Sequence, residues 1–299
     1  MPHIDSPSVL PFASSRLGRR SFLRAAGVLG LGAVATLPVK AAFADETESS
    51  QERAQETQQS KDTVKEIFTA ALIAEDLATT FYYNALVGPV IQDVNLAGPG
   101  GSATNVTAAG NFGNVAYLRA ALSQEIAHAN LFRSLLGISG PSGDPVQTFY
   151  FPSATFSTLS AFTGLLDALE NAFIGAYLNA IQEFATMSAR QRAFGNFNGE
   201  DGRYSTEQLD YFAKVSASIM GVESEHRVLG RVISNTNPAN NLAYEQTDGL
   251  NAVYNGPNSA VAALTPFLTS STGPGYSLAF ALANQASVSE PVSGAPPAF

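Results

Sequence analysis

The stretch ALSQEIAHANLFRSLLG, residues 121–137, places Glu125 three residues before His128. The stretch IMGVESEHRVLGRVI, residues 219–233, repeats this frame with Glu223 and His226. On a helix, residues three apart share one face with Cβ atoms about 5–6 Å apart, so one carboxylate and one imidazole can bind the same metal ion. The two frames therefore predict two helices that each contribute a carboxylate and an imidazole to a metal site.

Two further glutamates, Glu75 and Glu170, stand in the middle of apolar faces at helical spacing. The apolar neighbours on these faces are Ile67, Ala71, Ala78 and Tyr82 around Glu75, and Phe162, Leu166, Phe173, Tyr177 and Ile181 around Glu170. The two frames have apolar faces of the same kind, with Leu118, Leu122 and Phe132 in one and Phe212, Ile219 and Ile233 in the other. A glutamate within an apolar stripe points to the core of a helical protein, so four helices are expected to direct carboxylates into one interior.

Four buried carboxylates need positive charge nearby, because each desolvated charge costs several kcal/mol even after relaxation. Two divalent metal ions supply four positive charges, and helical bundles bind paired iron or manganese with two Glu-x-x-His helices and one further glutamate from each of two others. Buried arginine is the alternative. Arg119, Arg133 and Arg227 are near in sequence, but none lies on the stripe that carries the neighbouring glutamate.

The chain resembles the ferritin-like superfamily, and within it the desiccation-related and stress-associated ferritin-like proteins. Four stretches carry the resemblance: IAEDLATTFYYNAL (73–86), ALSQEIAHANLFRSLLG (121–137), LLDALENAFIGAYLNAI (165–181) and IMGVESEHRVLGRVI (219–233). The resemblance implies an all-α fold, a ferritin-like four-helix bundle. It also implies two Fe or Mn ions per chain, bound by Glu75, Glu125, His128, Glu170, Glu223 and His226.

Two tyrosines, Tyr82 and Tyr177, each lie seven residues after a predicted ligand and so two turns along the same face. They can donate hydrogen bonds to ligating carboxylates, or they can simply fill the core as aromatic rings. Asp167, three residues before Glu170, can orient a histidine N–H or serve as a surface or capping residue.

Residues 1–44 have the features of a twin-arginine signal peptide. Arg19-Arg20 precedes the weakly apolar run 25–37, and Ala42-Phe43-Ala44 forms a small-residue cleavage site, which makes Asp45 the expected mature N-terminus. A stable membrane anchor is not expected, because the run has only about 13 of the roughly 20 residues that span a bilayer. The leader predicts the twin-arginine translocase as a partner during export, and a periplasmic or other extracytoplasmic location.

Composition limits the remaining functions. The chain has no cysteine, which excludes disulfides, thiolate ligands and cysteine nucleophiles. Removal of the leader takes away five basic residues and one acidic residue, and moves the formal net charge from −9 to about −13. Such a charge argues against nucleic acid and anionic membrane surfaces as partners.

Four parts are expected along the chain. These are the signal peptide (1–44), a flexible polar lead-in (45–61), the four-helix bundle (62–235) and a small C-terminal extension with a loose tail (236–299). The helices are expected at about 62–86, 114–136, 156–187 and 205–234, with a long Gly- and Asn-rich first crossing at 88–113. Ser205 and Gln208 predict a capping box at the start of the fourth helix.

The leading functional hypothesis is a dinuclear metal protein that reacts with O₂ or peroxide and protects the cell envelope against oxidative or desiccation stress. Iron sequestration and a structural stress protein whose metal site only stabilises the bundle remain as alternatives, and the oligomeric state stays open. A hydrolase has little support, because both histidines outside the leader belong to the metal frames and no Gly-rich phosphate loop precedes a helix.

Overall fold

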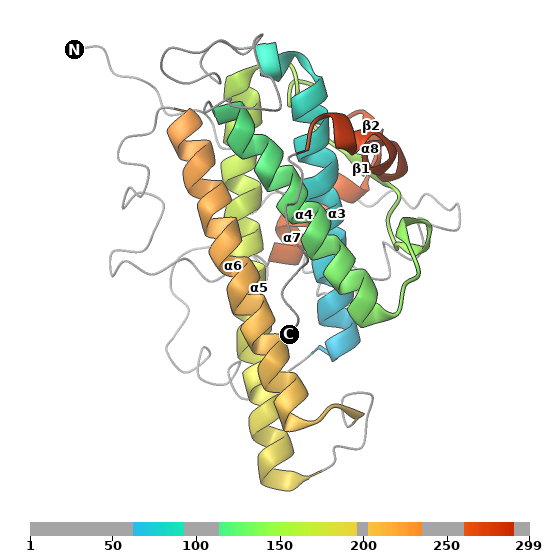
Figure 1. The fold of residues 1–299 in the computed structure, drawn as a ribbon, viewed down its shortest axis with the longest axis vertical. Coiled ribbons are helices and arrows are strands. Elements are labelled where there is room, and N and C mark those ends of the chain that lie inside the picture. The colour runs from blue at the N-terminus through green and yellow to red at the C-terminus, as the bar shows by residue number, and fades with distance from the viewer. Residues whose placement is uncertain (1–61, 93–113, 196–202, 235–259, 290–299) are drawn as a thin grey trace, which may run out of the picture.

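The computed structural model describes residues 62–92, 114–195, 203–234 and 260–289 (Figure 1). The predicted leader (1–44) and lead-in (45–61) lie outside these ranges, as do most of the first crossing and the end of the tail. None of the helices in these ranges combines the length and the apolar character that a membrane span requires.

Four long helices form the bundle: α3 (Val64–Val87), α4 (Asn114–Leu136), α5 (Leu159–Phe194) and α6 (Thr206–Ile233). In Figure 1, α3 and α6 run upward while α4 and α5 run downward. The closest packing is within two pairs, α3 with α4 and α5 with α6. This arrangement confirms the predicted all-α bundle.

Side-chain caps fix where the helices begin. Thr63 and Glu66 form a capping box at the start of α3, and Ser205 and Gln208 form the predicted one at the start of α6. Each cap satisfies backbone N–H groups that have no partner within the helix. The helix starts are therefore encoded locally.

Helix α5 differs from the sequence-based expectation at both ends. It begins at Leu159, because the Thr158 side chain accepts a hydrogen bond from the Ala161 N–H and caps the helix there. It continues past Met187 to Phe194, where Ser188 and Arg192 both bond Asp210 of α6. Gly195 then ends the helix in a left-handed conformation (φ 70°). The lower ends of α5 and α6 extend well beyond α3 and α4 (Figure 1).

A small sheet was not expected from the sequence. Strand β1 (Thr148–Tyr150) follows the short 3₁₀-helix η4 (Pro141–Gly143) and pairs antiparallel with β2 (Gly275–Ser277). Each strand has only three residues, too few to show alternation in a sequence. The sheet ties the crossing between α4 and α5 to the C-terminal segment.

The C-terminal segment packs against the bundle. It consists of α7 (Ala260–Leu264), η7 (Thr265–Leu268), β2, α8 (Leu278–Asn284) and η8 (Gln285–Ser287). Helix α7 lies against α5, and α8 lies against α3. A further 3₁₀-helix, η1 (Pro89–Gln92), follows α3 directly.

The buried apolar residues form two clusters, one on each side of the middle of the bundle. On α3, the first cluster contains residues from Ile73 to Leu86 and the second those from Val64 to Leu72. The same division occurs on α4 between Leu122 and Ala129. The predicted polar residues lie where these clusters meet, so the site is enclosed by apolar layers.

Candidate metal centre

The structure brings all six predicted ligands together, one or two from each long helix. Their carboxylate oxygens and imidazole nitrogens form two overlapping groups, each with atoms within 4.8 Å of one another. The first group is Glu75, Glu125, His128 and Glu223; the second is Glu125, Glu170, Glu223 and His226. The four glutamates are at most 2% exposed. That these residues are ligands stays a prediction, while their convergence is a property of the fold.

His128 directs its Nδ1 atom at three carboxylates. This atom lies 3.2 Å from Glu75 Oε2, 3.4 Å from Glu223 Oε1 and 3.7 Å from Glu125 Oε2. The three glutamates come from α3, α4 and α6. One imidazole therefore stands at the junction of three helices.

His226 has the corresponding position in the second group. Its Nδ1 atom lies 2.9 Å from Glu125 Oε1, 3.5 Å from Glu223 Oε2 and 3.9 Å from Glu170 Oε1. Its other ring nitrogen, Nε2, is 2.8 Å from Gln124 Oε1. When Nε2 carries the proton and donates to Gln124, Nδ1 keeps a free lone pair that faces the carboxylates, as a metal ligand requires.

Gln124 is a site residue that sequence reasoning missed. It directly precedes Glu125, and its partner stands on another helix, 102 residues away. Its position beside a frame glutamate was the one available signal, but that signal does not reveal which helix packs against it.

Several buried polar atoms of the site have no hydrogen-bond partner among the described residues. Glu125 and Glu223 each have two such oxygens. The other such atoms are Glu170 Oε2 and His226 Nδ1. His226 Nδ1 and Glu125 Oε1 are 2.9 Å apart, yet the angles between them do not form a hydrogen bond. Unpaired buried polar atoms are costly. Oxygen and nitrogen lone pairs that converge on the same space instead of on N–H donors suit Fe or Mn ions, so the residues present fit such a pair.

Without metal, the titration of the site is strongly perturbed. Burial raises the pKa of Glu75 and of Glu170 well above its usual value, and neighbouring carboxylates raise it further. Burial alone would lower the pKa values of His128 and His226, but the surrounding carboxylates outweigh it and raise both well above normal. Burial likewise opposes ionisation of Glu125, yet its contacts with the two histidines hold its pKa well below the usual value.

The two predicted tyrosines both donate hydrogen bonds to site glutamates, and they do so across the bundle. The Tyr82 hydroxyl on α3 donates to Glu170 Oε1 on α5 over 2.7 Å, and the Tyr177 hydroxyl on α5 donates to Glu75 Oε1 on α3. Burial is the main cause that raises the pKa values of both phenols. The two hydroxyls therefore keep their protons and remain donors.

The arginines near the site bond groups outside it. Among the described residues, the ion pairs of the four glutamates are with the two histidines. Arg133 bonds Asp76 and Asp144 instead, and Arg227 donates to Asn171. Asp167 accepts from Arg231 Nε at 2.8 Å and from the Asn171 amide at 3.1 Å, so both of its oxygens bond groups other than a histidine.

In the comparison with protein families, the model of the ferritin-like domain matches residues 63–200. The matched range contains four of the six residues, and ends before α6 with Glu223 and His226. Searches of curated proteins and of solved structures found no match.

Proposed function

From a ferritin-like domain at residues 63–200, we propose that the protein binds two Fe or Mn ions and carries out redox chemistry with O₂ or peroxide. The observation that carries this proposal is the convergence, in a buried space, of an imidazole nitrogen and carboxylate oxygens that have no hydrogen-bond partner among the described residues. Residues that only stabilise a core are expected to satisfy one another with hydrogen bonds.

Each ion has its own set of side chains. Glu75 and His128 belong to the first group only, and Glu170 and His226 to the second only. Glu125 and Glu223 belong to both groups, so these two carboxylates would help to hold each of the two ions. Four glutamates and two neutral imidazoles balance the charge of two divalent ions, which removes the electrostatic cost of the buried carboxylates.

Two adjacent redox-active ions, when bound, can exchange two electrons with O₂ or peroxide. The protein's own residues prepare the site for this exchange. Tyr82 and Tyr177 hold the carboxylates of Glu170 and Glu75 in place. The Gln124 side chain fixes the imidazole of His226. The apolar clusters on both sides limit the entry of water.

The setting of this chemistry is part of the same proposal. The twin-arginine leader at residues 1–44 supports export and a role in the cell envelope. The twin-arginine route carries proteins that are already folded, so the ions can be inserted before export. Protection against oxidative or desiccation stress follows from a site that consumes O₂ or peroxide outside the cytoplasm.

The test is elemental analysis of the purified protein, followed by assays of peroxide-dependent O₂ evolution and of Fe²⁺ oxidation. We expect about two Fe or Mn ions per chain and turnover in one of the assays. Iron that accumulates far beyond two per chain would favour sequestration instead. Bound metal without turnover in either assay would favour a structural stress protein, and the absence of bound metal would refute the proposal.

A further inference from the structure

A second feature of the bundle is a small apolar cavity between α3, α5 and α7, which opens partly to the surface because Ala70, Ala71 and Ala176 in its lining are only half-buried. Its volume is about 40 Å³. Five alanines line it from the two long helices: Ala70, Ala71 and Ala74 on α3, and Ala176 and Ala180 on α5. Because alanine has no side chain beyond Cβ, these helices leave space between them that α7 covers with Val261 and Leu264.

The cavity lies directly behind the candidate metal centre. The Tyr177 ring lines the cavity, and its hydroxyl donates to Glu75 of the centre. Ala74 is the residue before Glu75, and Ala71 lies one helical turn before it. A molecule in the cavity would therefore be separated from the carboxylates by a single aromatic side chain and one turn of helix.

Size and chemistry define what the cavity can hold. It exceeds the roughly 10–15 Å³ that one water molecule needs, but a buried water also needs two to four polar partners. Tyr177 is the one polar side chain in the lining, and its hydroxyl is already bonded to Glu75. The volume is also only about a quarter of the ~150 Å³ of an engineered cavity that binds benzene. The occupant must be both apolar and very small.

We propose that this cavity is a binding site for O₂, held beside the metal centre under the cover of α7. The choice of O₂ rests on the proposed redox function, since O₂ is the small apolar reactant of that chemistry. The capacity to take up a small apolar molecule rests on the cavity alone.

Xenon is the probe for that capacity, because it is apolar and enters dry cavities. Xenon binding to the full mature chain is measured by ¹²⁹Xe NMR and by diffraction from pressurised crystals, with and without metal. Xenon is expected between α3, α5 and α7 in both forms. Ala176→Leu, which adds a side chain to the lining, should abolish this binding, whereas Leu264→Ala should preserve or increase it.

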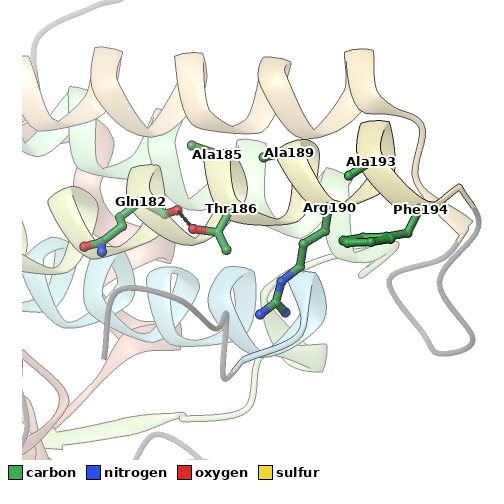
Figure 2. A pocket seen from close by; sticks show the side chains of 7 residues that line it. All are labelled: Gln182, Ala185, Thr186, Ala189, Arg190, Ala193 and Phe194. Carbon is green, nitrogen blue, oxygen red and sulfur yellow. Dashed lines mark hydrogen bonds between the residues drawn. The ribbon is translucent and has the colours of Figure 1, made fainter. Parts of the chain in front are cut away.

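The matched control is Ala189→Leu on the same helix. Figure 2 shows Ala189 with Ala185 and Ala193 among the residues of α5 that line an open hollow. These three alanines are exposed, and none of the six site residues lines this hollow. This control should leave xenon binding unchanged. If wild-type protein takes up no xenon at this place, or if Ala176→Leu binds it equally well, the proposal is wrong.

The assignment to O₂ has its own measurement on Fe²⁺-loaded protein. Ala176→Leu should keep its metal content but need a severalfold higher O₂ concentration for half-maximal oxidation, while Ala189→Leu matches wild type. An unchanged O₂ dependence would overturn the assignment. A chain that binds xenon but no metal would refute the proposed function alone, so the two failures are distinguishable.

Discussion

At the scale of single residues, the site is defined by which atom each histidine presents. Both imidazoles direct Nδ1 at the carboxylates. Both stand three residues after a glutamate of their own helix, at 3.7 Å and 3.5 Å from that glutamate. The Glu-x-x-His frame thus has the geometric consequence that its spacing predicts.

Replacement of both histidines, His128→Ala with His226→Ala, should remove the bound metal. No other histidine lies in the chain after the predicted leader, so neither imidazole can be replaced. Elemental analysis and isothermal titration with Mn²⁺ measure the loss. The control is Glu225→Gln, which changes an exposed glutamate on α6, the helix of His226. This variant should bind metal normally. Unchanged metal content in the double variant would refute the ligand assignment.

Replacement of Gln124 by leucine should weaken metal binding by about 10–100-fold, the usual effect of losing a partner that orients a ligand. Without the acceptor oxygen, His226 loses the contact that keeps its proton on Nε2. Metal titration gives the affinity, and ¹⁵N NMR of the metal-free protein, at a pH above the raised pKa of His226, reports which ring nitrogen keeps its proton.

Gln124→Glu keeps an acceptor oxygen and should retain the Nε2-protonated form of His226. Gln182→Leu, on the exposed face of α5, tests for a general effect of leucine and should bind metal normally. A Gln124→Leu variant with wild-type affinity and an unchanged histidine spectrum would show that the contact does not position His226.

At the scale of the helices, a buried ionic network joins α3, α4 and the segment after η4. Arg133 donates from Nε to both carboxylate oxygens of Asp144, at 3.0 and 2.9 Å, and from Nη2 to Asp76. All three side chains are nearly inaccessible, with Arg133 3% exposed. The network fixes the end of α4 against the helix that carries Glu75.

Arg133→Met should lower the free energy of unfolding by about 3–5 kcal/mol, because two buried carboxylates lose their partner. Arg192→Met is the matched control. It removes the ion pair with Asp210, whose side chains are 59% and 50% exposed, and should cost no more than about 1 kcal/mol. Urea denaturation of both variants gives the comparison. Equal losses would mean that the buried network adds nothing specific.

Much of the bundle was predictable because its signals are local. The stripes and caps place the long helices. The two frames select four of the six residues that the structure brings together, and the apolar stripes select Glu75 and Glu170. Contacts between distant segments were not predictable, because no periodicity encodes them. The Gln124–His226 contact, the Asp167–Arg231 pair and the three-residue strands β1 and β2 all depend on how distant segments pack.

At the scale of the whole molecule, the titration of the site makes the stability of the metal-free fold depend on pH. Glu75, Glu170, His128 and His226 all have raised pKa values in the metal-free fold. A group whose pKa is higher in the folded than in the unfolded protein stabilises the fold at low pH. This contribution is lost as the pH rises from the pKa of the unfolded state to the pKa of the folded state. The lowered pKa of Glu125 contributes stability that is fully present above its unfolded value of 4.5 and is lost only as pH falls below it, so it does not change between about pH 5 and pH 8.

The melting temperature of the metal-free protein should therefore fall between about pH 5 and pH 8. Bound metal has the opposite dependence, because its ligands must lose their protons and affinity grows with pH. The difference in melting temperature between metal-loaded and metal-free protein should widen over this range in calorimetry. A constant or narrowing difference would contradict a buried metal pair.

Export concerns the chain as a whole and has a separate test. Replacement of Arg19 and Arg20 by lysine should leave the precursor in the cytoplasm, because the translocase recognises the arginine pair. Fractionation and immunoblotting measure the two pools, with Arg24→Lys outside the pair as the control. A normal amount of mature protein in the periplasm would point to another route.

The crossed tyrosines have a consequence for the alignment of the bundle. Tyr82 and Glu75 lie on α3, and their partners Glu170 and Tyr177 lie on α5, so the two hydrogen bonds join the same helices at two levels. A shift of one helix by a single residue moves it about 1.5 Å and turns its side chains by about 100°, which would break both bonds together. The two hydrogen bonds together therefore fix the axial register of α3 against α5. The two helix pairs of the bundle are aligned in this way before any metal ion binds.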